Sequence, residues 1–279
     1  MELFAAADLS VHRSSDVDYR ASIDDPRIGD VRILRPQEIP VYVAEGRFDL
    51  GITGRDWIEE RGAEVVSLGE LGYSKATSNP IRVVLAVSAD SPYGSLEDLA
   101  AHQGRLRVST EYPDLTARSL AEAGIDAEVS LSYGATEAKV PDIADCVVEI
   151  TETGRALRAA GLKIIHTLLI SRTELVANPA SAADPVKRHA MGQLMTLLEG
   201  TLEAREKVLV KLNVPTAQLD GVLGVLPSLR SPTISELSGG SGYAVETVVE
   251  KAKINTLIPD LKDQGATDIL ELALSKIVH

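Results

Sequence analysis

Short apolar runs that alternate with short helical patterns set the strongest constraint on how this chain can fold. The runs at 48–53, 81–88, 106–110, 127–131 and 146–150 have the length of buried strands, and the helical patterns between them often end at glycine. Strands that alternate with helices in this way are typical of α/β proteins. We therefore predict parallel sheets covered by helices.

The chain from residue 206 onward has a different order of elements. Strands are expected at 208–212, 232–237, 243–250 and 269–278, with helices at 215–225 and 254–263. The order β-α-β-β-α-β is that of the ferredoxin-like arrangement, which predicts a separate small domain of a kind often used to sense ligands. A long helix that begins at Asp184 and Pro185 is expected before it.

Composition excludes several classes of protein and of site. The net charge of −13 over 279 residues disfavours a nucleic-acid partner, whose phosphates would be repelled. Cys146 is the single cysteine, so neither an internal disulfide nor a cysteine-cluster metal site can form. The sequence has no apolar run of membrane length and no segment typical of a signal peptide, so a soluble cytoplasmic protein is expected.

The stretch 142–162 carries the strongest indication of function. Its apolar run includes one acid, Glu149, and the turn Thr151-Glu152-Thr153-Gly154 then leads into a short helical pattern. A strand that turns into a helix N-terminus presents backbone N–H groups to an anion, and hydroxyls and arginines accompany them here. With Glu149 near sugar hydroxyls, the stretch suits a phosphorylated ribose. Because many α/β proteins contain such turns, the residues alone also suit a purely structural turn.

A second strand followed by Thr-Gly ends at Thr53 and Gly54, with Arg55 and Asp56 beyond it. Ligands of doubly wound sheets bind at the carboxyl ends of strands, which would place Thr53, Gly54 and Asp56 at such an edge. Asp56 also suits the cap of a helix that begins near Trp57. On the residues alone, we favour this cap for Asp56.

In these segments the chain resembles the long form of ATP phosphoribosyltransferase, the first enzyme of histidine biosynthesis. The matching segments follow the family's order over nearly the whole chain, at 34–40, 46–56, 134–140 with Ala144-Asp145, 149–162 and 231–233. Each segment alone is a weak signal, whereas the set is highly specific.

The resemblance implies an α/β fold with two periplasmic-binding-protein-like lobes, a cleft between them and a C-terminal ferredoxin-like (βαββαβ) regulatory domain. Lobe I would comprise residues 1–78 and 177–205, lobe II residues 79–176, and the regulatory domain residues 206–279. The implied activity is that of a pentosyltransferase: N1 of ATP attacks phosphoribosyl pyrophosphate, and pyrophosphate leaves with Mg²⁺ bound to it. L-histidine would inhibit, and the chain would form homo-oligomers such as dimers and hexamers.

The resemblance also implies three groups of binding residues. Phosphoribosyl pyrophosphate would be held by Glu149, Thr151, Glu152, Thr153, Gly154, Arg155, Ala156 and Leu157. ATP would lie against Arg35, Thr53, Gly54 and Asp56 on the other lobe. Histidine would bind at Asn213, Leu229, Ser231 and Thr233, where a strand that begins near Thr233 would lie beside the turn at 213–215.

Neither a catalytic acid or base nor a protein ligand of Mg²⁺ is singled out. The attacking N1 is already a lone-pair nucleophile, so catalysis should depend on positioning and on stabilising the charge of the departing pyrophosphate.

Three features depart from the family's pattern. The family begins with a strand and a Lys-Gly-Arg phosphate-binding loop, whereas this chain is expected to start inside the helix that follows, at Met1. Ala156 stands where the family often has threonine, which removes a hydroxyl donor. Ala160 replaces an asparagine at the end of the helix, a change expected to be mild.

A non-catalytic function is the alternative that the sequence leaves open. The strand edge at 49–52 would equally suit one lobe of a cytosolic small-molecule-binding sensor. Histidine binding without binding of ATP or phosphoribosyl pyrophosphate would favour the sensor.

Overall fold

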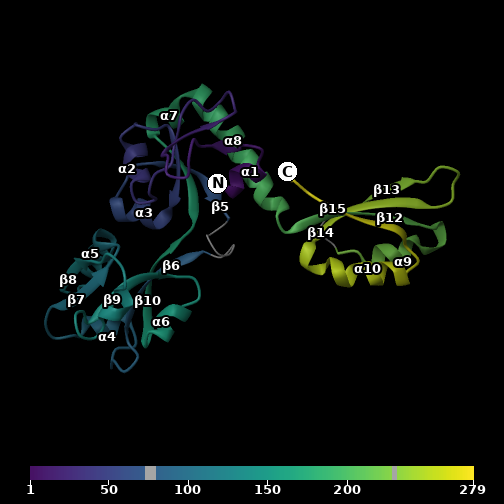
Figure 1. Cartoon of the computed structure of the whole chain (residues 1–279). Coiled ribbons are helices and arrows are strands. Elements are labelled where there is room, and N and C mark those ends of the chain that lie inside the picture. The colour runs from purple at the N-terminus through teal and green to yellow at the C-terminus, as the bar shows by residue number, and fades with distance from the viewer. Residues whose placement is uncertain (73–79, 228–230) are drawn as a thin grey trace. The chain divides into compact units, whose positions relative to one another are not determined.

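The computed structural model describes residues 1–72, 80–227 and 231–279 of the chain (Figure 1). These residues form two compact units. The larger comprises Arg13–Ala21 and Asp30–Met195, and the smaller comprises Met1–His12, Ser22–Gly29 and Thr196–His279. Among the described residues, no helix is both long and apolar enough to cross a membrane.

The larger unit contains a three-stranded sheet with the strand order β4-β11-β5, and β11 runs antiparallel to both neighbours. Val43 and Ile58 from two helices pack against Val176 of β11 in one buried cluster. We call this sheet and its helices the first lobe. Its elements are β4 (Leu50–Gly54), β5 (Val66–Leu71), β11 (Thr173–Ala177), α2 (Ile39–Ala44), α3 (Arg55–Arg61) and α7 (Pro179–Ala183).

The second lobe of the larger unit is built on a five-stranded sheet with the order β10-β6-β9-β7-β8. Its strands are β6 (Ile81–Ser88), β7 (Leu106–Thr110), β8 (Ala127–Leu131), β9 (Cys146–Thr151) and β10 (Leu162–Ser171). Its helices are α4 (Leu96–Ala100), α5 (Pro113–Glu122) and α6 (Arg155–Ala159), with a 3₁₀ turn η1 (Thr136–Lys139).

This sheet is mixed, so the prediction of parallel sheets is wrong for part of it. Strand β7 runs parallel to β8 and β9, whereas β6 runs antiparallel to β9 and β10. The reason lies in the connections: β6 follows β5 of the first lobe in chain order, and β10 leads directly into β11 of that lobe. A chain that enters and leaves through neighbouring strands must run in opposite directions along them.

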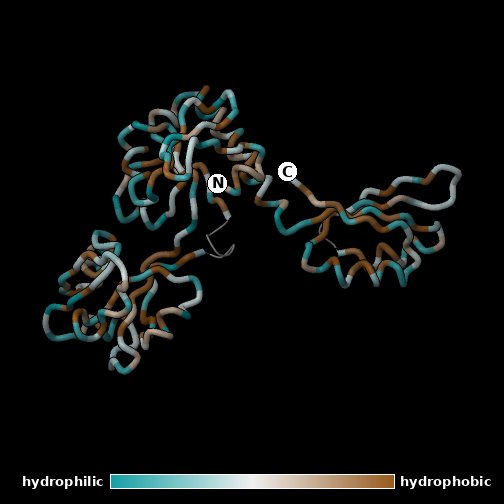
Figure 2. Tube along the Cα trace, viewed as in Figure 1, coloured by the Kyte–Doolittle hydropathy of each residue, from teal (hydrophilic) through white to brown (hydrophobic). Residues whose placement is uncertain are grey.

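Strand β6 lies between β10 and β9 and is buried on both faces, as its apolar sequence predicts. Val83 and Leu85 face one buried cluster, while Val84 and Ala86 face another on the opposite side of the sheet. All four are fully buried, so helices or loops cover both faces of this strand. Hydrophobic segments follow the strands of both lobes in Figure 2.

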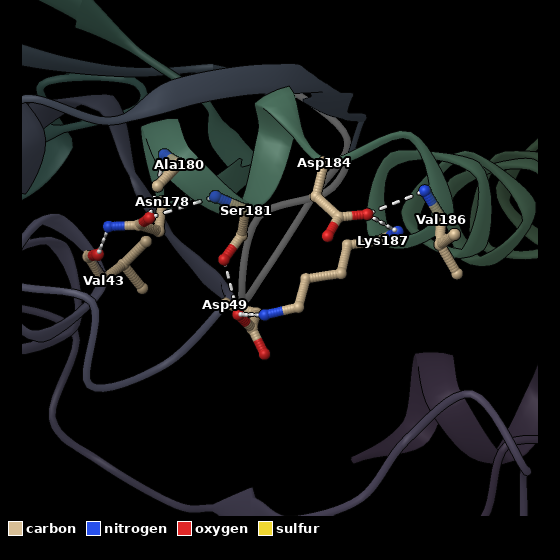
Figure 3. Close-up of polar contacts among 8 residues, drawn as sticks. All are labelled: Val43, Asp49, Asn178, Ala180, Ser181, Asp184, Val186 and Lys187. Carbon is tan, nitrogen blue, oxygen red and sulfur yellow. Dashed lines mark hydrogen bonds and ion pairs between the residues drawn. The ribbon is translucent and has the colours of Figure 1, made fainter.

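A polar cluster joins α7 and the start of the long helix α8 (Pro185–Ala204) to α2 and to Asp49 of the first lobe (Figure 3). The side chain of Asn178 accepts hydrogen bonds from the N–H groups of Ala180 and Ser181, and its amide donates to the carbonyl groups of Val43 and Ala44. Asp49 accepts from Ser181 and from Lys187. The predicted start of α8 is confirmed, because Asp184 Oδ1 accepts from Val186 N and Lys187 N.

The C-terminal part of the smaller unit is a four-stranded antiparallel sheet with the order β13-β14-β12-β15. Its elements are β12 (Lys207–Val214), η2 (Thr216–Gln218), α9 (Leu219–Val225), β13 (Thr233–Glu236), β14 (Tyr243–Glu250), η3 (Lys251–Lys253), α10 (Ile254–Asp263) and β15 (Thr267–Ala273). This is the predicted βαββαβ domain. Alternate residues of β12, from Val208 to Val214, are buried in one cluster with Val222 of α9 and Leu257 of α10, so the other face of the sheet is open to solvent.

Several short elements complete the chain: α1 (Glu2–Ala6), β1 (Val11–His12), β2 (Arg20–Ile23) and β3 (Val31–Arg32). The closing strand expected at 269–278 ends at Ala273 instead. Beyond it, Ile277 N donates to Gly200 O of α8 (2.8 Å), because the tail leaves the sheet to pack on this helix.

Candidate active site

The turn after β9 is organised by its own hydroxyl groups. Thr151 Oγ1 accepts a hydrogen bond from Gly154 N (2.7 Å), and Thr153 Oγ1 lies 3.4 Å from Arg155 N, which donates to it. Gly154 has a φ of +72°, which glycine adopts without strain, and an added Cβ would lie 2.9 Å from Arg158 Nη1 and 3.0 Å from Ile164 Cδ1. The predicted strand, turn and short helix are therefore all present.

Helix α6 follows this turn and packs against the sheet through one buried side chain. Leu157 is buried with Val84 and Val147, whereas Arg155 and Ala156 are exposed. All three residues are predicted to bind phosphate. Because the side chain of Leu157 lies in the core, Leu157 can contact a ligand only through its backbone.

Glu149 lies two residues before the end of β9 and is half-buried. Burial raises the pKa of its carboxyl group, although hydrogen bonds from Ile150 N and from the Thr136 hydroxyl act in the opposite direction. Glu111 and Glu137 also raise this pKa by repulsion.

A lysine is connected to Glu149 through two hydroxyl groups. Lys139 Nζ donates to Ser132 Oγ (2.6 Å) and Ser109 Oγ (3.1 Å), and Ser132 Oγ lies 2.8 Å from Thr136 Oγ1. Thr136 in turn bonds to Glu149. From the sequence, Lys139 suits a solvated surface cation; in the structure it is half-buried and belongs to this network near the carboxyl ends of β7, β8 and β9.

Asp56 of α3 is buried and fully engaged at the junction of the two lobes. Its Oδ2 accepts from the Tyr112 hydroxyl (2.8 Å), and its Oδ1 accepts from Ser171 Oγ (2.6 Å). The Trp57 ring packs on Tyr112 with centroids 4.5 Å apart. Burial, followed by the nearby Asp56 charge, raises the pKa of Tyr112, so this phenol remains a hydrogen-bond donor.

A second buried acid on α3 caps a helix of the other lobe. Glu60 accepts from Asp114 N (3.1 Å) and Leu115 N (2.8 Å) at the start of α5, which lies near α3 in Figure 1. An acidic group at this end of α5 also complements the helix dipole. Helices α3 and α5 thus link the lobes through hydrogen bonds to buried acids.

The remaining ATP-site candidates lie at the carboxyl end of β4. Thr53 Oγ1 donates to Pro36 O (2.9 Å), which ties β4 to the segment that carries the exposed Arg35. At Gly54 a Cβ would lie 2.1 Å from Asp56 Oδ1, so only glycine leaves room for this carboxylate. Thr53 and Gly54 end β4, and Asp56 follows in the first turn of α3. The expectation that Asp56 caps this helix is wrong: α3 begins after Gly54 without a side-chain cap, because the carboxylate of Asp56 bonds to Tyr112 and Ser171 instead.

The histidine-site candidates lie on the C-terminal sheet, but the predicted adjacency is wrong. Strand β14 lies between β12 and β13, so Thr233 is not beside the turn that begins after Asn213. The register places Asn213 opposite Ala244, and Ala244 opposite Ser235, so Asn213 and Thr233 share the open face of the sheet. Asn213 Nδ2 donates to Asp268 Oδ2, Ser231 is exposed, and Leu229 lies outside the described residues.

Tyr112 is the main residue that sequence reasoning missed. It follows the predicted strand at 106–110, whose carboxyl end lies at the same sheet edge as that of β9, because these strands are parallel. That placement was a usable signal. No described group of three or more His, Cys, Asp or Glu side chains could hold a metal ion.

The model of a family described as ATP phosphoribosyltransferase matches residues 35–200, and one described as HisG, C-terminal domain matches residues 204–276. An ATP phosphoribosyltransferase of Desulforudis audaxviator is 44% identical over 274 residues, covering 98% of this chain and 92% of that protein. One from Nitratidesulfovibrio vulgaris (strain DP4) is 46% identical over 261 residues, covering 93% and 87%.

A solved structure shares the fold. In the ATP phosphoribosyl transferase (HisG:HisZ) complex from Thermotoga maritima, one chain superimposes with a TM-score of 0.60 at 25% identity, covering 73% of this chain and 92% of that one.

Proposed function

Because this chain belongs to the ATP phosphoribosyltransferase family, the pentosyltransferases of histidine biosynthesis, we propose that it joins ATP to phosphoribosyl pyrophosphate. The observation that carries the proposal is the turn at 151–154, which begins two residues after Glu149. In this turn Thr151 Oγ1 accepts a hydrogen bond from Gly154 N, and Gly154 has a positive φ.

The phosphoribosyl donor is assigned to the second lobe. Residues 151–157 would hold its 5′-phosphate through backbone N–H groups and through the hydroxyls of Thr151 and Thr153. Glu149 would accept hydrogen bonds from the ribose hydroxyls while it is ionised. The exposed Arg155 adds a positive charge beside the turn, which offsets the negative charge of the whole chain.

ATP is assigned to the carboxyl end of β4 and its surroundings. Arg35 is exposed and would meet the charged part of the nucleotide, whereas Thr53 and Asp56 are buried and hydrogen-bonded internally. Their role in the ATP site would be to fix the shape of this edge. Gly54 would keep Asp56 against the sheet.

The reaction needs little proton chemistry. N1 of adenine forms a bond to C1 of the ribose as the bond from C1 to the pyrophosphate oxygen breaks, and pyrophosphate takes the electron pair. Catalysis then depends on holding N1 and C1 in line and on stabilising the leaving group. Mg²⁺ would bind the pyrophosphate group of the substrate and neutralise part of its charge. Held in this way, the ion would not need a cluster of three or more protein ligands, and none is found among the described residues.

The organisation into domains is proposed to follow the function. Residues 1–78 and 177–205 would form the lobe that takes ATP, and residues 79–176 the lobe that takes the phosphoribosyl donor. Residues 206–279 would bind histidine as an inhibitor, through Asn213 and Thr233 on the open face of the sheet. We propose that the chain works as a homo-oligomer.

Histidine inhibition can be tested in the full chain by Thr233→Val. Loss of inhibition with unchanged uninhibited turnover supports this site. Thr256→Val on α10 is the control, because it removes a hydroxyl on the helix side of the sheet. Full inhibition in Thr233→Val would argue against Thr233 as a histidine contact.

The test of the activity is release of pyrophosphate from ATP plus phosphoribosyl pyrophosphate, compared between Gly154→Ala and Gly161→Ala. Both glycines flank α6 with positive φ, but a Cβ at Gly161 meets nothing within 4 Å. We expect Gly154→Ala to lower kcat/KM for phosphoribosyl pyrophosphate by about tenfold or more, with a much smaller effect of Gly161→Ala. If the two substitutions lowered kcat/KM equally, the 151–154 turn would not be part of the binding site. If the unaltered chain released no pyrophosphate, the proposed activity would be refuted.

A further inference from the structure

Arg82 of β6 lies directly beside the first residue of the 151–157 turn. The strand register pairs Arg82 with Thr151 of β9 on one side and with Ile170 of β10 on the other. Side chains of directly opposed residues lie on the same face of a sheet, with Cβ atoms about 5 Å apart. Arg82 and Thr151 therefore leave the sheet side by side.

The face on which they lie is the face that carries α6. Val84 and Ala86, two and four residues along β6 from Arg82, pack with Leu157 of α6 on this side of the sheet. Ile164 of β10 belongs to the same cluster and approaches Gly154. The side chain of Arg82 is thus at the end of the sheet where the turn leaves β9, on the side to which the turn folds.

Arg82 is also placed for a ligand by its surroundings. It is half-buried, and its neighbour Ile170 is 60% exposed, so one side of it is open to solvent. Among the described residues, no ion pair of Arg82 is found, whereas Arg55 is paired with Glu59 and lies near Glu174, and Lys163 donates to Ser91 O. A half-buried guanidinium on a chain of net charge −13 is a natural partner for an anion.

We propose that Arg82 is a further binding residue for the 5′-phosphate of the phosphoribosyl donor, which it contacts from β6 opposite the 151–157 turn. This inference rests on the proposed function. An arginine can place two N–H groups on two phosphate oxygens, a geometry that lysine does not match. The turn would supply backbone N–H groups and hydroxyls, and Arg82 would add a guanidinium charge to that of Arg155.

Calorimetric titration with two probes tests this role: ribose 5-phosphate, which carries the 5′-phosphate, and pyrophosphate, which does not. Arg82→Met should lower the affinity for ribose 5-phosphate by about tenfold or more, and Arg82→Lys should lower it by less. In both variants the affinity for pyrophosphate should stay within about twofold of that of the unaltered chain. Arg105→Met is the matched control, since it removes an exposed arginine of the same lobe whose ion pair with Asp126 lies on the surface. Thermal unfolding of each variant checks that it is folded.

The outcomes separate this inference from the function on which it rests. Suppose that Gly154→Ala binds ribose 5-phosphate more weakly but Arg82→Met binds it as tightly as the unaltered chain. This result overturns the role of Arg82 and leaves the proposed function intact. A selective loss of pyrophosphate affinity overturns it as well. If Arg82→Met does not fold, Arg82→Gln replaces it with the same criteria. An unaltered chain that binds neither probe nor phosphoribosyl pyrophosphate refutes both.

Discussion

At the scale of single residues, buried acids hold the two lobes of the larger unit together. Asp56 and Glu60 lie on one helix of the first lobe, and both accept hydrogen bonds from the start of α5 in the second. A buried carboxylate is costly unless its oxygens are satisfied, and here each acid has two donors. The junction between the lobes is therefore specified by hydrogen bonding as well as by packing.

Replacing Tyr112 with phenylalanine tests this junction. The substitution keeps the ring on Trp57 and removes the donor to buried Asp56, so we expect a loss of about 1–3 kcal/mol in the free energy of unfolding. Urea unfolding measures it. Tyr133→Phe is the control, because Tyr133 is 93% exposed. Equal stability of both variants would mean that the bond to Asp56 contributes nothing.

Glu149 predicts a pH dependence of stability. Burial raises the pKa of its carboxyl group above the ordinary 4.5, so above pH 4.5 the folded chain holds this proton more tightly than the unfolded chain does. The contribution of Glu149 to the free energy of unfolding is therefore fully present below pH 4.5 and is lost as pH rises through the raised pKa. Glu149→Gln, which stays neutral, should gain stability relative to the unaltered chain across that window.

Urea unfolding at a series of pH values from 4 upward measures this gain, with exposed Glu128→Gln on β8 as control. A difference between Glu149→Gln and the unaltered chain that does not change with pH would contradict the raised pKa.

Residue-scale inference from sequence succeeded where partners are close in the chain. The bond from Gly154 N to Thr151 Oγ1 spans three residues and follows from the turn itself. The partners of Asp56 are 56 and 115 residues away, so its bonds to Tyr112 and Ser171 could not be predicted, and the expected helix cap does not form. The same holds for Lys139, whose partner Ser109 is 30 residues distant.

At the scale of elements, the polar cluster of Figure 3 fixes how α7 lies against α2 within the first lobe. Asn178 satisfies two N–H groups at the start of α7 and donates to two carbonyl groups at the end of α2. One amide therefore completes the hydrogen bonding of two helix ends.

Asn178→Ala should cost about 2 kcal/mol of unfolding free energy, because it removes a helix cap and leaves two carbonyl groups at the end of α2 without this donor. Chemical denaturation provides the measurement. Asn255→Ala, at an exposed position of α10, should change stability by less than about 0.5 kcal/mol. Equal stability of the two variants would mean that the hydrogen bonds of Asn178 contribute nothing measurable to folding.

Elements were predicted best where the apolar pattern is continuous. The strands expected at 106–110 and 127–131 form with those bounds, because both lie within one sheet and are ended by polar residues. Strand direction was predicted worse: periodicity along a strand does not report its neighbours, so the antiparallel pairs of β6 could not be derived from it.

At the scale of the whole molecule, the C-terminal domain is formed by one continuous segment of the chain. The order βαββαβ is complete within residues 207–273, so its local pattern was sufficient to predict the domain. The two lobes are harder to predict, because the chain passes from β5 to β6 and returns through β10 and β11. Their assignment depended on the resemblance to a family, which the matches over residues 35–200 and 204–276 confirm.

The central claim is that this chain transfers a phosphoribosyl group to ATP. Its most direct test is to incubate the full chain with ATP, phosphoribosyl pyrophosphate and Mg²⁺ and to identify the nucleotide product by NMR. The predicted result is a ribose bonded to N1 of adenine, with one pyrophosphate released for each bond formed. Unaltered ATP, or pyrophosphate released without a new bond at N1, would contradict the claim.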